Sequence, residues 1–278
     1  MRFHRHRMTL YDTIGQGYAR TRAADPRITA QLLALLDLPA GSTVLDVGAG
    51  TGKYSRALAE HGYTMMALEP SEVMQAQAVA HAGVTFVRGS AEAIPLPDAS
   101  AHGAIVVLAL HHFTDRAAAF REMLRVVGEG PVVFLTFDAR AIRGIWLGDY
   151  FPMLGRAFRS SYAELLDVTA EVERLASRNV QAVPFPLPRD LVDKFGAASW
   201  GEPEAYLREE VRRGISDFAL MEESQVNAGL ERLKQELHSG EWDAKYGVLR
   251  HEESYECGYK FLLVEGRSPA GEERVLHP

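Results

Sequence analysis

Residues 43–52 read Thr-Val-Leu-Asp-Val-Gly-Ala-Gly-Thr-Gly, and this stretch decides the fold. Its first half is short, apolar and β-branched, which is typical of a buried strand. Its second half contains Gly48, Gly50 and Gly52, which allow the backbone to turn tightly and to approach a ligand. A helical pattern follows over 53–61 and ends at a glycine. The sequence therefore predicts a strand, a ligand-binding turn and a helix.

Short strands and helices alternate along the rest of the chain. We expect strands at 64–68, 84–87, 104–110, 131–137 and 180–185, and a last strand within 255–265. We expect helices at 27–37, 53–61, 71–82, 116–127 and 162–176. This alternation is typical of βαβ units with helices on both faces of a parallel sheet. The predicted fold class is α/β, a Rossmann-like doubly wound sheet.

A helical insert interrupts this pattern late in the chain. One apolar face is expected from Leu207 to Phe218 and a second from Val226 to Leu237. Because the insert is short, we interpret it as a cap over the active site. The predicted organisation comprises an N-terminal segment at 1–26, a core at 27–138, a cap region at 139–254 that includes the strand near 180–185, and a last strand and tail at 255–278.

Composition limits the function. The formal net charge of −7 argues against a surface for nucleic acid, which requires a basic patch. Cys257 is the only cysteine, so we expect no internal disulfide and no cysteine-based metal cluster. Neither a signal peptide nor an apolar run of about 20 residues is found, which predicts a cytoplasmic protein away from the membrane. The oligomeric state stays open.

An acidic residue follows the second strand at an informative spacing. Glu69 stands 21 positions after Gly48, where a carboxylate can accept hydrogen bonds from both hydroxyls of a ribose. The glycine spacing is G-x-G-x-G, whereas the turn that binds a dinucleotide pyrophosphate has G-x-G-x-x-G. The pattern favours a nucleoside cofactor without a pyrophosphate and disfavours an NAD-dependent oxidoreductase.

Four motifs carry a family resemblance. Residues 44–52 resemble the signature loop of class I S-adenosylmethionine-dependent methyltransferases, and 67–71, Ala-Leu-Glu-Pro-Ser, resemble their second motif. Residues 89–97, Gly-Ser-Ala-Glu-Ala-Ile-Pro-Leu-Pro, are similar to the adenine-binding stretch. Residues 108–113, Leu-Ala-Leu-His-His-Phe, occupy the position of the fourth-strand motif. The resemblance covers about residues 9–138, half of the chain.

The N-terminus adds a narrower likeness. Tyr11-Asp12, Tyr18 and Arg22 resemble the segment that folds over the cofactor in the ubiquinone-biosynthesis-like branch. Arginine can pair with the carboxylate of the cofactor or of a substrate, and the alternative for Arg22 is a salt bridge to Asp25 or another acid. The two tyrosine rings would lie against the sulfonium or the substrate, because aromatic faces attract cations.

The resemblance implies that S-adenosylmethionine is the cofactor. It places the backbone of Gly48 and Gly50 at the methionine moiety, Glu69 at the ribose, and the Leu108 carbonyl at the ammonium group. Many relatives have aspartate where Ser90 stands, so a hydroxyl or a water would replace that adenine contact. The candidate cofactor-binding residues are Tyr11, Tyr18, Arg22, Asp46, Gly48, Ala49, Gly50, Gly52, Glu69, Pro70, Ser90, Ala91, Glu92 and Leu108.

Catalytic candidates follow the buried strands, where open α/β sheets place their ligands. His111 and His112 are candidate acid/base groups, or structural histidines bonded to a neighbouring loop. Asp138 could bind a substrate amine or hydroxyl, or cap a following helix. Tyr11 completes the set. A sulfonium carries its own leaving group, so alignment and exclusion of water can suffice for methyl transfer.

Three functions are compatible with these residues. Methyl transfer to a small-molecule acceptor is the leading hypothesis. Azetidine-2-carboxylate synthases resemble methyltransferases but let the cofactor's own amine attack its γ-carbon, which releases methylthioadenosine, and a closed aromatic pocket would serve that reaction. A non-catalytic S-adenosylmethionine-binding module is the third. The cap contains an aromatic set, for which core packing is the alternative: Trp146, Tyr150, Phe151, Phe158, Tyr162, Trp200 and Tyr206.

Overall fold

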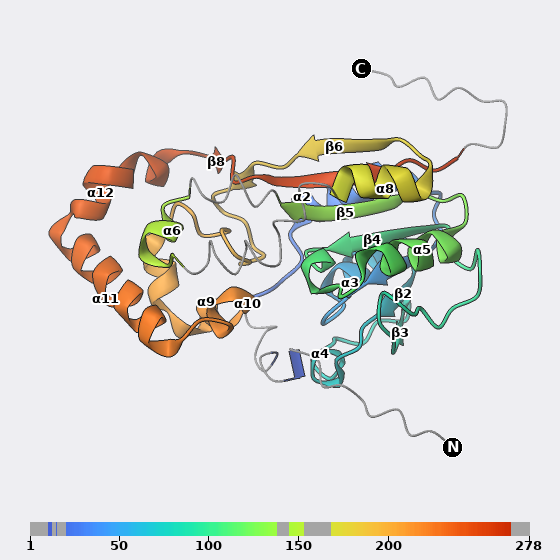
Figure 1. The fold of residues 1–278 in the computed structure, drawn as a ribbon, viewed down its shortest axis with the longest axis horizontal. Coiled ribbons are helices and arrows are strands. Elements are labelled where there is room, and N and C mark those ends of the chain that lie inside the picture. The colour runs from blue at the N-terminus through green and yellow to red at the C-terminus, as the bar shows by residue number, and fades with distance from the viewer. Residues whose placement is uncertain (1–10, 13–14, 16–20, 138–144, 153–167, 268–278) are drawn as a thin grey trace.

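The computed structural model describes residues 11–12, 15, 21–137, 145–152 and 168–267. Its centre is a seven-stranded sheet in the order β3-β2-β1-β4-β5-β9-β6 (Figure 1). Strand β9 runs antiparallel to both of its neighbours, and the other pairings are parallel. The strands are β1 Thr43–Val47, β2 Thr64–Leu68, β3 Val84–Val87, β4 Gly103–Val107, β5 Val132–Phe137, β6 Val180–Pro184 and β9 Tyr259–Val264. The predicted Rossmann-like sheet is confirmed.

Helices cover both faces of the sheet. The core helices are α2 Pro26–Leu36, α3 Lys53–Glu60, α4 Glu72–Gln75, α5 Arg116–Val127 and α8 Val168–Ala176. Helix α2 begins where the Asp25 side chain accepts a hydrogen bond from the Arg27 N–H, and Pro26 occupies its first position. Helix α5 begins in the same way, because Asp115 accepts a hydrogen bond from the Ala118 N–H. Local capping thus sets the residue at which each of these two helices begins.

Alternate residues of the strands pack into two different core clusters. Val44 and Ile105 join the cluster of α2 and α3, whereas Leu45 and Val106 join that of α5. All four side chains are 0% exposed. Burial on both faces explains why the strands have continuous apolar sequences instead of an alternating pattern.

The cap lies beyond the carboxyl ends of the parallel strands, on the left in Figure 1. Its elements are α6 Leu147–Tyr150, η5 Pro203–Leu207, α9 Glu209–Arg213, α10 Ser216–Ala219, α11 Glu223–Ser239, α12 Glu241–Tyr246, η6 Gly247–His251 and the strand pair β7 Leu187–Pro188 and β8 Ser254–Tyr255. None of the helices in the described ranges is long and apolar enough to cross a membrane. The domain boundaries themselves stay a prediction.

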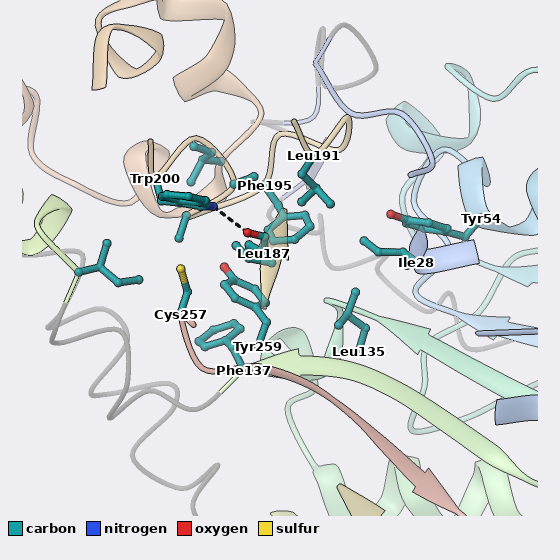
Figure 2. Packing of buried hydrophobic residues seen from close by; sticks show 14 of the residues in the cluster. Ile28, Tyr54, Leu135, Phe137, Leu187, Leu191, Phe195, Trp200, Cys257 and Tyr259 are labelled. Atoms are coloured by element: carbon teal, nitrogen blue, oxygen red, sulfur yellow. Dashed lines mark hydrogen bonds between the residues drawn. The ribbon is translucent and has the colours of Figure 1, made fainter. Parts of the chain in front are cut away.

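Aromatic side chains hold the cap together. The Trp146 indole N–H donates to the Trp200 carbonyl at 2.8 Å, and the Trp200 indole N–H donates to the Leu187 carbonyl at 3.0 Å (Figure 2). The described members of the predicted aromatic set are at most 4% exposed, as expected for core packing: Trp146, Tyr150, Phe151, Trp200 and Tyr206. Phe158 and Tyr162 lie outside the described residues.

Two expected elements of the core are shorter than predicted. The helix expected at 71–82 is only Glu72–Gln75, because the later residues have no surface to pack against: none of 76–82 is buried, and Val79 is 63% exposed. Its predicted N-cap is confirmed, since the Ser71 hydroxyl accepts a hydrogen bond from the Met74 N–H. The strand expected at 104–110 ends at Val107, where the backbone turns. Of the helix expected at 162–176, the structure describes 168–176.

The helical insert also differs from its prediction. The single face expected from Leu207 to Phe218 is divided between short helices, because the chain turns at Gly214 between α9 and α10. The second face is one continuous helix, α11. The strand expected within 255–265 is interrupted before β9 by Gly258, whose φ is +80°.

Candidate active site

The turn after β1 requires its glycines. The φ angles of Gly48, Gly50 and Gly52 are +75°, +60° and +70°, a region that side chains disfavour. A Cβ on Gly48 would stand 2.6 Å from the Ala109 Cβ, and one on Gly52 would stand 2.7 Å from the Phe86 Cζ. The loop is therefore a cradle that keeps bare backbone at the carboxyl edge of the sheet, where a ligand can approach it closely.

We expect Gly52→Ala to lower the free energy of unfolding by about 2 kcal/mol, from left-handed backbone strain and overpacking. Chemical denaturation measures this change. The double variant Gly52→Ala/Phe86→Leu should recover the packing part of the loss and leave the backbone part. A single variant as stable as the wild type would contradict this view of the turn.

Glu69 is fixed beside this loop at the end of β2. Its Oε2 accepts a hydrogen bond from the Gly50 N–H at 2.8 Å, and its Oε1 accepts one from the Ser71 N–H at 2.9 Å. Burial raises the pKa of Glu69, and these two N–H donors oppose that rise. Each carboxylate oxygen retains acceptor capacity. The geometry fits the predicted hydrogen bonds to two ribose hydroxyls.

The end of β4 has an unusual backbone. Leu108 has a φ of +53°, and its N–H donates to the Leu135 carbonyl at 2.9 Å. A residue other than glycine in this region costs of order 1–3 kcal/mol, and such positions cluster at functional sites. Leu108 is also the position at which the family resemblance places a carbonyl contact to the cofactor's ammonium group. The strained turn supports that prediction.

Two of the other candidate cofactor residues, Asp46 and Glu92, form hydrogen bonds within the protein. Asp46 is 2% exposed and accepts a hydrogen bond from the Ser55 hydroxyl at 2.6 Å, so it anchors α3. Glu92 Oε1 accepts hydrogen bonds from the Thr114 N–H at 2.7 Å and the Thr114 hydroxyl at 3.1 Å, which holds the turn before α5. Contacts of the cofactor with Ala49, Pro70, Ser90, Ala91 and Glu92 stay predictions.

Arg22 belongs to a buried charge cluster that the sequence did not reveal. Asp193 is 0% exposed, and its carboxylate lies 2.5 Å from the Arg22 Nε and 2.9 Å from the Lys53 Nζ. The Tyr54 hydroxyl donates to it at 3.0 Å. Burial alone would raise the pKa of Asp193, but the two cations outweigh burial and lower it. Arg22 thus pairs with an acid other than Asp25, which binds Arg27 instead.

The structure brings three catalytic candidates together. The Tyr11 hydroxyl lies 3.1 Å from the His112 Nε2, and the ring centroids of His111 and His112 are 3.8 Å apart. Burial lowers the pKa of His112 to about 4 and places that of His111 well below its usual value. Both imidazoles are neutral at neutral pH. Asp138 and Tyr18 lie outside the described residues.

The neutral histidines predict a pH dependence. In the unfolded chain, His112 takes up a proton near pH 6.5, about its ordinary pKa. In the folded protein, His112 takes up a proton only near pH 4. Its contribution to stability is consequently lost as the pH falls between these values. The NMR signals of the His112 imidazole are assigned by their absence in His112→Gln. In the wild type, we expect their chemical shifts to stay constant between about pH 8 and 5.5. A midpoint near 6.5 would contradict burial of this group.

The comparisons with known proteins agree with this site. Residues 45–135 match a family model described as a methyltransferase domain. A crystal structure of an Anabaena variabilis protein, provisionally assigned as a methyltransferase from an antibiotic biosynthesis pathway, has 45% identity and a TM-score of 0.85 and covers 88% of this chain and 98% of that chain. The chain thus belongs to the class I S-adenosylmethionine-dependent methyltransferases. S-Adenosylmethionine is its cofactor.

Two curated relatives each match about half of the chain. An uncharacterized methyltransferase of Mycobacterium bovis is 36% identical over 121 residues, 43% of this chain and 49% of the relative. The O-methyltransferase resE of Aspergillus sclerotiorum is 36% identical over 159 residues, 53% of this chain and 60% of the relative. The chain spans about half the length of the curated relatives it matches. The ubiquinone-biosynthesis-like branch stays a prediction.

Proposed function

We propose that the protein transfers the methyl group of S-adenosylmethionine to a small-molecule acceptor. One observation carries this proposal: the glycine cradle with Glu69 and the Tyr11–His112 pair lie at the same carboxyl edge of the sheet. The bound cofactor supplies an electrophilic methyl group with a built-in leaving group. The residues of the chain have to orient the cofactor and the acceptor and exclude water.

Individual residues divide this work. Glu69 orients the ribose, and the Leu108 carbonyl orients the amino acid end. The hydrogen bond between the Tyr11 hydroxyl and the His112 Nε2 fixes the imidazole ring. With Nε2 as its donor, the neutral ring keeps Nδ1 free to accept a proton from the acceptor or to hold a water. Similarity to an O-methyltransferase supports methyl transfer as the reaction. The net charge of −7 supports an acceptor other than nucleic acid, and the single buried Cys257 fits a reducing cytoplasm.

The cyclase alternative has lost the observation that suggested it. It relied on cap aromatics that enclose the cofactor's amino acid tail, but the described members of that set pack against one another and against the cap core. The ring centroids of Trp146 and Trp242 are 5.3 Å apart, and those of Trp146 and Tyr206 are 5.6 Å apart. No described contact favours cyclisation over methyl transfer.

Methyl-labelled cofactor tests the proposal. The protein is incubated with trideuteromethyl S-adenosylmethionine and low-molecular-mass metabolite fractions, and the products are identified by mass spectrometry. We expect S-adenosylhomocysteine and one metabolite that carries three deuterium atoms. His112→Gln should slow this product and leave cofactor binding unchanged. Tight cofactor binding without turnover in any fraction would instead support the non-catalytic module.

A further inference from the structure

Asp193 is a buried carboxylate of the cap, in the loop that follows β7, and the proposed mechanism does not use it. Leu191 and Phe195, two positions before and after it, are buried in the same hydrophobic cluster as Tyr54 (Figure 2). The intervening Val192 is exposed. Because buried and exposed positions alternate here, the Asp193 side chain is directed inward with its two hydrophobic neighbours.

Helix α3 begins directly after the glycine turn that follows β1. Gly52 occupies its N-cap position without a side-chain hydrogen bond, whereas an aspartate side chain caps both α2 and α5. Asp46 anchors α3 on the side of the sheet. On the side of the cap, the Lys53 Nζ lies 3.0 Å and 2.9 Å from the two carboxylate oxygens of Asp193, to which the Tyr54 hydroxyl donates at 3.0 Å. The cap thus holds the first two residues of the helix that continues from the glycine turn.

The same carboxylate also binds the N-terminal segment. The Arg22 Nε lies 2.5 Å from the Asp193 Oδ1, and the Arg22 Nη1 donates to the Gly214 carbonyl of the cap at 2.9 Å. The Lys194 N–H donates to the Thr21 carbonyl at 3.1 Å. A Cβ on Gly214 would stand 2.5 Å from the Thr21 Oγ1, which shows how closely the two segments pack. Asp193 is therefore the point at which the cap, the N-terminal segment and the start of α3 meet.

Burial makes this three-way contact strong. The side chains of Arg22 and Lys53 are 7% and 12% exposed, so a displacement of the cap that withdrew Asp193 would leave two buried cations without its charge. We propose that Asp193 is a positioning residue for the cofactor: from the cap, it holds the first turn of α3, and with it the backbone of the glycine turn, in the position that binds the cofactor. Cofactor binding and the cap contact are then coupled, and by linkage each strengthens the other.

Hydrogen–deuterium exchange of the full-length protein tests this coupling, with S-adenosylhomocysteine as the probe. We expect the bound probe to slow exchange of the backbone amides in the glycine turn and the start of α3, residues 48–55, and also in the cap loop 190–196. The Val192 and Lys194 amides of this loop donate to the N-terminal segment, so their exchange reports on the cap contact. Helix α11, which belongs to the same cap, should exchange at an unchanged rate.

Substitution assigns the coupling to one side chain. Asp193→Asn should abolish the response of the loop 190–196 and weaken S-adenosylhomocysteine binding by about 10-fold, a usual size for coupling between sites. Lys53→Met should weaken binding to a similar extent, and the double variant should bind no more weakly than either single variant, because residues that act through one contact are not additive. Calorimetry gives each Kd, and circular dichroism checks that each variant is folded at the temperature of measurement.

Asp25→Asn is the matched control. Asp25 is also 0% exposed and joins the same two segments, since its carboxylate accepts a hydrogen bond from the Val192 N–H at 2.9 Å and pairs with Arg27. Its substitution loosens the contact between the cap loop and the N-terminal segment but leaves the ion pair of Asp193 with Lys53 in place. We expect the Kd for S-adenosylhomocysteine to stay within about twofold of the wild type, as for sites that are not coupled.

Three results would overturn the inference. The first is a wild-type loop 190–196 whose exchange does not respond to the bound probe, a result that decides the question even if Asp193→Asn fails to fold. The second is a loop response that persists in Asp193→Asn, which would indicate direct contact of the loop with the probe. The third is an equal loss of affinity in Asp193→Asn and Asp25→Asn, which would indicate a general loss of stability. A wild type that does not bind S-adenosylhomocysteine would contradict the cofactor assignment instead.

Discussion

Replacement of Asp193 by asparagine is expected to lower the free energy of unfolding by about 3–5 kcal/mol, the usual cost of removing one partner from a buried ion pair. The carboxylate compensates Arg22 and Lys53 and accepts a hydrogen bond from Tyr54. These partners belong to the N-terminal segment and to α3, whereas Asp193 belongs to the cap loop. Chemical denaturation of wild type and variant measures the loss.

The neighbouring Asp190 provides the matched control. Its side chain is 83% exposed and pairs with Arg27, so Asp190→Asn should change stability by less than about 1 kcal/mol. The Asp193 contribution should also depend on pH. Because the folded pKa is lowered, the contribution is present above about pH 4, the ordinary carboxyl pKa, and is lost as the pH falls through the folded value. If Asp193→Asn and Asp190→Asn were equally stable, the result would contradict a buried ion pair at Asp193.

Replacement of Glu69 by glutamine should weaken S-adenosylmethionine binding by about 100-fold, because hydrogen bonds to a charged group contribute about 1.5–3 kcal/mol each. The amide cannot accept at both ends, so it conflicts with the Gly50 and Ser71 N–H donors as well as with the ribose hydroxyls. Isothermal titration calorimetry gives the change in Kd.

Glu72→Gln is the appropriate control for this variant. Glu72 lies three residues further along, its side chain is 71% exposed, and it forms a surface pair with Arg88. Its substitution should leave cofactor affinity within about twofold of the wild type, as for other exposed groups. An unchanged Kd in Glu69→Gln would show that this carboxylate does not hold the ribose.

The cofactor half of the site was predictable because its determinants are local. The strand at 43–47, the glycine turn and Glu69 lie within one βαβ unit, so spacing along the chain determines their separation in space. The structure confirms the strand bounds and the positive φ angles of Gly48, Gly50 and Gly52. Where local patterns erred, as at 71–82, the helix ended because its later residues had no surface to pack against.

The buried charge cluster after the glycine turn was not predictable, because its partners are distant in sequence. Asp193 and Lys53 are separated by 140 positions, and no motif marks either of them. Asp217 is one of several charged residues in the helical insert, and an aspartate there is ordinarily expected to be exposed. It is 9% exposed on α10, which the turn at Gly214 separates from α9.

The most direct measurement is mass spectrometric analysis of the nucleosides formed when the purified protein is incubated with S-adenosylmethionine alone. Methyl transfer predicts that the cofactor is bound and stays intact until an acceptor is added, after which S-adenosylhomocysteine appears. Protein-dependent methylthioadenosine in the absence of an acceptor would contradict methyl transfer, since it would show attack on the γ-carbon instead of the methyl group.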